Sequence, residues 1–218
     1  MLDLIAAGGW VMLPILLCSA MALAITLERG WALRTRLVIP PRLVKQMPEL
    51  VRAGFDADRI RALRADSPLG RILAAALASH GDDWTITRER IEEAGRHVLH
   101  ELERYLNTLG TIAAVTPLLG LLGTVIGMIK VFAAITASGV GNPQALAGGI
   151  SEALLTTAAG LTVAIPTLMV YRYFRGRIDE LVVGMESEVI RLMELIAHEE
   201  PGPGEPAEEA GQPARAPS

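Results

Sequence analysis

The longest weakly charged segment of this chain restricts its fold more than any other feature. Between Arg104 and Arg172 only Lys130 and Glu152 carry charge, and the turn-forming residues 137–143 interrupt the apolar sequence near its middle. Each half is longer than the roughly 20 residues that a helix needs to cross the hydrocarbon core of a bilayer. The segment therefore predicts a hairpin of two membrane-spanning helices. They are expected at residues 106–136 and 144–172.

A further apolar segment lies near the N-terminus. No charged residue occurs from Leu4 to Leu27, and Glu28 and Arg29 follow it rather than a small-residue cleavage site, so we expect a retained helix and not a signal peptide. The chain is 51% hydrophobic but only 4% aromatic, and its many Leu and Ala residues favour helices over barrel strands. The sequence thus predicts an all-α integral membrane protein with three transmembrane helices and long cytoplasmic helical extensions.

Basic residues flank the predicted spans unequally. They follow the first and third spans, whereas the 137–143 loop carries no charge, and such residues favour the cytoplasmic side. We therefore expect a periplasmic N-terminus and a cytoplasmic C-terminus. The basic residues are Arg29, Arg34, Arg36, Arg42 and Lys45 after the first span, and Arg172, Arg175 and Arg177 after the third.

The remaining sequence divides around these spans. Charged and apolar residues alternate at helical spacing before Arg104, and we expect a helix that is capped near Thr87 and runs straight into the second span. An apolar stripe continues from the third span to Ile196. After Glu199 the composition is too polar and too rich in Pro to bury a core. The expected segments are residues 1–28 (first span), 29–104 (cytoplasmic helical region), 105–175 (hairpin), 176–198 (cytoplasmic helical extension) and 199–218 (disordered tail).

Polar side chains are expected at matched depths in the hairpin. If the turn is centred near Val140, Thr124 and Thr157 are level, at about 25 Å of helix rise from it. The same count places Lys130 within about one turn of Glu152, close enough for an ion pair. Glu152 is a candidate for an ion pathway, because ionisable residues within membranes normally face a bundle interior or a wet cavity. The alternative is a helix-start carboxylate that the helix dipole or Lys130 stabilises.

Small residues share helix faces with the threonines. They permit close helix packing without any pathway, and a threonine hydroxyl can bond to a carbonyl one turn back. A second interpretation is a hydroxyl-lined path, since hydroxyls beside a narrow gap bind water or relay protons. The candidates for the path are Thr124, Thr156, Thr157 and Glu152, and those for helix packing are Gly120, Gly123, Gly127 and Gly160.

Other function classes lack their sequence signals. We find no phosphate loop, nucleophile elbow or metalloprotease His-Glu motif, so neither an enzyme nor a cofactor is expected. Cys18 is the single cysteine, and the four histidines fall in predicted cytoplasmic segments, so we expect no metal site. Basic residues are not clustered with aromatic ones, which argues against nucleic acid as a partner.

Two motifs in the hairpin resemble a known family. Residues 109–127 contain Gly-Leu-Leu-Gly-Thr-Val, and residues 150–166 contain Glu-Ala-Leu-Leu-Thr-Thr. Their order, spacing and three-span layout are similar to the MotA/TolQ/ExbB proton channel family, over about 105–175. The resemblance implies that Thr124 is the pore threonine, Thr157 the threonine of the third span and Glu152 the family's glutamate. Thr156 stands where relatives often have alanine, and Lys130 where they have other polar residues.

The resemblance also implies an assembly and a function. It implies a homo-pentamer in the bacterial inner membrane whose second and third spans surround the helices of an ExbD- or TolR-like single-span partner. In that family an aspartate of the partner carries the proton, and proton flow drives motion passed to a TonB- or TolA-like protein. The absence of a fourth span and the short N-terminus favour ExbB over MotA and TolQ. A TolQ-like subunit of the Tol-Pal system and a non-conducting membrane scaffold remain alternatives.

Overall fold

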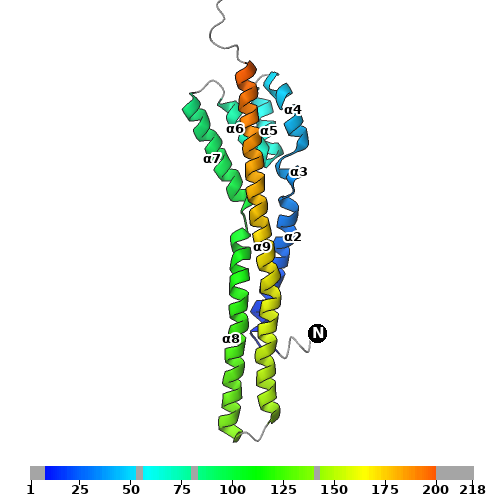
Figure 1. Cartoon of the computed structure of the whole chain (residues 1–218), viewed down its shortest axis with the longest axis vertical. Coiled ribbons are helices and arrows are strands. Elements are labelled where there is room, and N and C mark those ends of the chain that lie inside the picture. The colour runs from blue at the N-terminus through cyan, green and yellow to red at the C-terminus, as the bar shows by residue number, and fades with distance from the viewer. Residues whose placement is uncertain (1–7, 53–55, 80–82, 140–142, 200–218) are drawn as a thin grey trace, which may run out of the picture.

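The protein is an elongated bundle of helices. The computed structural model describes residues 8–52, 56–79, 83–139 and 143–199, and these contain helices but no strand (Figure 1). The predicted all-α class is thereby confirmed. The first seven residues and residues 200–218, where a disordered tail is expected, lie outside the described residues.

Three helices are long and apolar enough to cross a membrane, which confirms the three predicted spans. They are α2 (Met12–Ala32), α8 (Leu106–Ser138) and α9 (Pro143–Glu199). Large apolar side chains project from all three, as expected of helices that face lipid. The protein is therefore an integral, multi-pass membrane protein.

The first span begins later than its apolar sequence suggested. Residues 8–11 precede the helix as a turn, and Gly9 has a φ of +67°, a left-handed conformation that glycine adopts without strain. Helix α2 then runs from Met12 past Glu28 to Ala32. Trp10 lies just before it and Trp31 in its last turn; they are 62% and 66% exposed and about 31 Å apart along the helix axis. Tryptophans favour membrane interfaces, so we expect these two side chains near the two boundaries of the bilayer.

The helix before the second span is interrupted, and our expectation of a continuous helix was wrong there. Helix α7 (Trp84–Leu102) ends one turn before α8, and Tyr105 between them has a φ of +63°. Arg29 in the last turn of α2 contacts this break and donates to the carbonyls of Glu101 and Leu102 at the end of α7. The cap of α7 is Asp83, which accepts from the Thr85 amide, and not Thr87.

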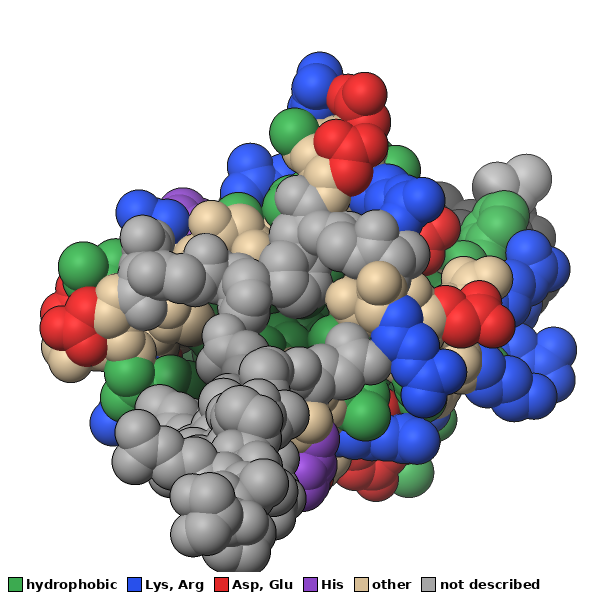
Figure 2. Space-filling model, turned by 90° about the horizontal axis from the view of Figure 1, so that it is seen from above, with side chains coloured by type: hydrophobic (Ala, Val, Ile, Leu, Met, Phe, Trp, Pro, Cys, Tyr) green, Lys and Arg blue, Asp and Glu red, His purple; other side chains and the backbone are tan. Residues whose placement is uncertain are grey.

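The other end of the molecule is a bundle of short helices around α9. It contains α3 (Thr35–Val38), α4 (Pro41–Arg52), α5 (Ala57–Asp66), α6 (Pro68–Ala78) and α7. We call residues 35–102 and 174–199 the distal bundle. Its core is aliphatic, with Leu69, Leu73, Ile178 and Leu192 almost fully buried. Charged side chains of both signs surround this end of the molecule (Figure 2).

Helix α9 connects the two regions. It continues without interruption from the hairpin through the distal bundle for 57 residues, as the apolar stripe predicted. Figure 1 shows α8 and α9 side by side along the hairpin, whereas α7 diverges from α9 in the distal bundle.

Candidate functional site

The two hairpin helices approach so closely that the glycines on their contact face have no room for a side chain of their own. A Cβ atom at Gly123 would lie 2.1 Å from Thr156 Oγ1, and one at Gly127 would lie 2.7 Å from the Gly149 carbonyl oxygen. At Gly160 it would lie 2.8 Å from the Thr116 carbonyl oxygen. Gly120 contacts the backbone of residues 156 and 157 in the same way, at 3.1 Å. These glycines set the separation and the register of α8 and α9.

This register places Thr157 one turn away from its predicted partner. Thr157 Oγ1 donates to the Gly120 carbonyl across the helix interface at 3.0 Å. Thr124 lies a turn nearer the hairpin tip and donates to Leu121 on its own helix at 2.6 Å. Counting from Val140, which lies outside the described residues, ignored the offset that the glycine contacts impose. Both hydroxyls belong to half-buried residues.

Thr156 is placed differently from the other two threonines. It is 0% exposed, faces Gly123, and donates to the carbonyls of Glu152 and Ala153, each at 3.0 Å. Thr116 is equally buried and bonds to Ile112 at 2.6 Å. We did not single out Thr116 in the sequence. Its spacing of four, seven and eleven residues from Gly120, Gly123 and Gly127 places it on the same helix face and is the signal that identifies it.

The two charged residues of the hairpin meet across the helices. Lys130 Nζ lies 2.6 and 2.7 Å from the two carboxylate oxygens of Glu152. The side chain of Glu152 is only 14% exposed, whereas that of Lys130 is 51% exposed. The turn before α2 adjoins this pair, because a Cβ on Gly9 would lie 2.1 Å from Glu152 Oε1.

These groups differ in what they can do chemically. A threonine hydroxyl that donates to a carbonyl still has lone pairs to accept from water or from a passing proton donor. The partial exposure of Thr124 and Thr157 leaves this capacity accessible, whereas Thr156 and Thr116 are enclosed. No cluster of three or more His, Cys, Asp or Glu that could hold a metal occurs in the described part of the chain.

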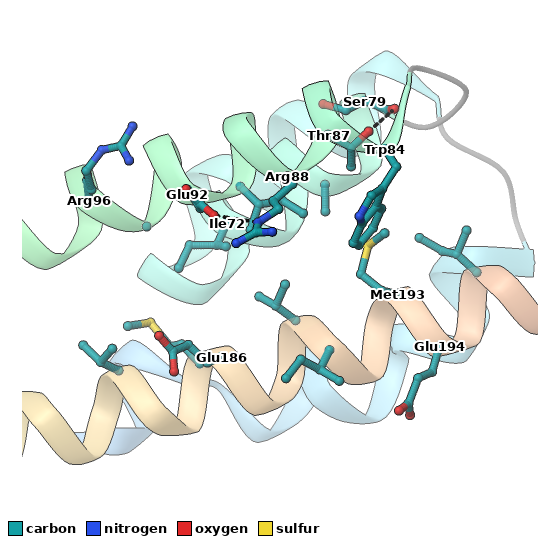
Figure 3. Close-up of a pocket in the computed structure, with 18 of the residues that line it drawn as sticks. Ile72, Ser79, Trp84, Thr87, Arg88, Glu92, Arg96, Glu186, Met193 and Glu194 are labelled. Carbon is teal, nitrogen blue, oxygen red and sulfur yellow. Dashed lines mark hydrogen bonds and ion pairs between the residues drawn. The ribbon is translucent and has the colours of Figure 1, made fainter.

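A separate groove of about 1,240 Å³ lies in the distal bundle, away from the hairpin. Figure 3 shows Arg88 and Arg96 on α7 along one side, and Glu186 and Glu194 on α9 along the other. Apolar residues including Ile72, Val189 and Met193 line it. The groove contains none of the candidate path residues.

Comparison with known proteins agrees with the architecture. Residues 64–187, more than half of the chain, match the MotA/TolQ/ExbB proton channel family. The biopolymer transport protein ExbB-like 3 of Synechocystis sp. is 37% identical over 78% of this chain and 82% of its own length. The biopolymer transport protein exbB1 of Vibrio cholerae is 31% identical over 73% of this chain and 72% of its own length. The Tol-Pal system protein TolQ of Haemophilus influenzae is 39% identical over 38% of this chain and 36% of its own length.

The match includes the whole of α6, α7 and α8 and most of α9, so it spans both the hairpin and the distal bundle. The similarity to ExbB-like 3 of Synechocystis sp. extends over most of both proteins. The family consists of proton channels and not of enzymes. On these grounds the chain belongs to the MotA/TolQ/ExbB proton channel family.

Proposed function

We propose that this chain is the ExbB-like channel subunit of an inner-membrane motor that uses the proton gradient to power an outer-membrane process. A TonB- or TolA-like protein would receive the motion. The observation that carries this proposal is the hairpin itself, in which half-buried hydroxyls of Thr124 and Thr157 lie on helices that glycines hold in close contact. The names of the ExbB-like relatives support transport of biopolymers as the process.

In this proposal the threonines have unequal roles. Thr124 and Thr157 line the proton path, because their hydroxyls are accessible and can accept hydrogen bonds. Thr156 borders the path only indirectly, since it is enclosed against Gly123 and supports the position of Thr157 beside it. Glu152 and Lys130 form an ion pair. In this proposal the pair controls the local charge of the hairpin between the threonines and the hairpin tip.

The proposed assembly is a homo-pentamer whose second and third spans surround the helices of an ExbD- or TolR-like single-span protein. The family match over the hairpin and the similarity to ExbB and TolQ proteins support this arrangement. We propose that the N-terminus is periplasmic and the distal bundle cytoplasmic. The arginines that follow α2 and the hairpin support this orientation.

Two alternatives each rest on a specific observation. A TolQ-like subunit is favoured by the similarity to a TolQ protein. A non-conducting scaffold is favoured by the glycine contacts, which hold α8 and α9 together whether or not protons move.

Proton flux into proteoliposomes tests the proposal. The complex would be purified with the single-span subunit from the same organism, and Thr157→Val and Thr124→Val would be compared with Thr157→Ser. Removing a hydroxyl from the path should lower flux about tenfold or more, the equivalent of one lost hydrogen bond in the rate-limiting step. The Ser variant should retain most of the flux.

Thr162→Val is the matched control. Thr162 is exposed on the same helix and donates to Ala158 at 2.7 Å, so its loss should leave flux unchanged. Full flux in stably assembled Thr124→Val and Thr157→Val complexes would refute the path role of these hydroxyls. If the wild-type complex assembled but conducted no protons, the scaffold alternative would replace the channel.

A further inference from the structure

One carboxylate is the meeting point of all three spans. Lys130 on α8 binds both oxygens of Glu152 on α9, at 2.6 and 2.7 Å. Gly9, in the turn that leads into α2, lies against the same group, with 2.1 Å between a Cβ built on Gly9 and Glu152 Oε1. A side chain on residue 9 would have to displace the tip of Glu152. The start of α2 and the two hairpin helices thus converge on Glu152.

This contact lies at the level of one bilayer boundary. Trp10, which follows Gly9 and is exposed, marks that boundary. Lys130 lies eight residues before the end of α8, so the hairpin continues for about 12 Å of helix rise beyond the contact. The ion pair therefore joins the spans where they leave the hydrocarbon.

Glu152 and Lys130 differ in how far their side chains are exposed. The carboxylate is mostly enclosed, whereas the lysine is half exposed on its flexible stem. Lys130 and Glu152 are also the only charged residues between Arg104 and Arg172. An enclosed carboxylate without a counter-charge is strongly unfavourable, so Glu152 depends on Lys130 more than Lys130 depends on Glu152.

We propose that Glu152 is a positioning residue in this chain, and that it fastens α2, α8 and α9 together through Lys130 and Gly9 without carrying protons itself. A carrier must exchange its proton with water and with the next group on the path. Both oxygens of Glu152 are instead bound by one ammonium group, and Gly9 lies against Oε1. The inference refines the proposed function, and its transport measurement rests on that function.

Paired variants of the co-purified complex test this inference through thermal melting and proton flux. Lys130→Met leaves the carboxylate without a counter-charge and should lower the melting midpoint by about 5–10 °C. Glu152→Gln should have a smaller effect, because the half-exposed lysine can reach water. The double variant Lys130→Met/Glu152→Gln removes both charges and should recover most of the stability and at least half of the wild-type flux.

The turn supplies a matched pair of variants. Gly9→Ala should lower the midpoint, because its Cβ would displace the carboxylate and because a φ of +67° strains any residue with a side chain. In a Glu152→Ala background only the backbone strain remains, so the same substitution should lower the midpoint less. Gly8→Ala should not, because it meets only the flexible end of Met12. If Glu152→Gln and the double variant both melted like the wild type but lost flux tenfold or more, Glu152 would be a carrier and the inference wrong. Unchanged melting in both Lys130→Met and Gly9→Ala would equally overturn it. The melting results decide the fastening role even if the wild-type complex conducts no protons.

Discussion

The hairpin and the distal bundle use the same helix, α9, but pack it in different ways. In the hairpin, glycines bring the backbones of α8 and α9 into contact and leave room only for small side chains such as those of Thr156 and Ala153. In the distal bundle, large aliphatic side chains such as Leu73 and Leu192 form the core, and α7 stands away from α9 beside a wide groove. Both regions are helical, yet their contacts differ in residue size and in separation.

The difference follows from the solvent around each region. Lipid is as apolar as a leucine side chain, so burying leucines gives helices no reason to associate within a membrane, and close van der Waals contact must hold them. The distal bundle has charged residues around its rim, and there burial of apolar area drives association. We therefore expect the hairpin to be sensitive to added volume and the distal bundle to removed volume.

The largest expected effect comes from adding volume to the hairpin. Gly123→Leu would force its side chain into Thr156, whose Oγ1 and Cβ lie 2.1 and 2.5 Å from the Cβ position. We expect a loss of about 3 kcal/mol or more, seen as failed assembly or a melting midpoint lowered by at least about 10 °C. Gly176→Ala on α9, with nothing within 4 Å, should not lower the midpoint and should raise it slightly, because alanine favours a helix more than glycine does. Equal tolerance of both changes would contradict close backbone packing.

In the distal bundle, the matching test removes side-chain volume instead of adding it. Leu73→Ala removes a side chain that is 1% exposed and should cost about 2–5 kcal/mol through lost burial and a new cavity. Val183→Ala, at an exposed position of α9, should cost far less. Chemical denaturation followed by circular dichroism measures both. A similar cost for the two variants would mean that the bundle relaxes around the missing side chain.

The joint between the regions gives an intermediate effect. Arg29 is 5% exposed and donates to the Glu101 and Leu102 carbonyls at 3.1 and 3.3 Å. Arg29→Gln should cost about 2 kcal/mol, because two carbonyls at the end of α7 lose a charged donor. Arg29→Lys should recover only part, since an ammonium lacks the planar fork of arginine. Hydrogen exchange of residues 99–106 should rise in the Gln variant, and unchanged exchange would rule out this role for Arg29.

The sequence predicted the regions better than their contacts. A membrane span must satisfy its backbone internally, so uncharged runs such as the one around Thr124 identify helices almost without regard to tertiary structure. The break before Tyr105 is contacted by Arg29, which is more than 70 residues away in the chain. No local pattern encodes that contact, because the residues around Tyr105 have ordinary helical preferences.

In the candidate site, too, the sequence predicted which residues matter better than which residues they contact. The motifs identified Thr124, Thr157 and Glu152, since residue type and spacing are local properties. The partner of Thr157 was not predictable by counting from the turn, because the glycine contacts shift the register by about one turn. Whether a threonine is enclosed, like Thr156, or half exposed, like Thr157, depends on the facing helix. The contact of Gly9 with Glu152 is of the same kind and has no signal in the sequence.

The smallest expected effect concerns an ion pair on the surface of the distal bundle. Arg71 donates two hydrogen bonds of 2.6 Å to Glu101, and this bonding, aided by their opposite charges, lowers the pKa of Glu101 below its usual 4.5. A carboxylate whose pKa is lower in the folded state adds stability above its unfolded pKa and loses it as the pH falls through the folded value. Glu101→Gln should therefore cost at most about 1 kcal/mol at neutral pH, because the pair is exposed and screened. The difference from the wild type should shrink below pH 4.5 and disappear in stronger acid. Melting curves of both proteins from pH 3 to pH 7 (~half-unit steps) measure this difference. If the difference in stability between the two proteins grew as the pH fell, Glu101 would instead be stabilised in its protonated form.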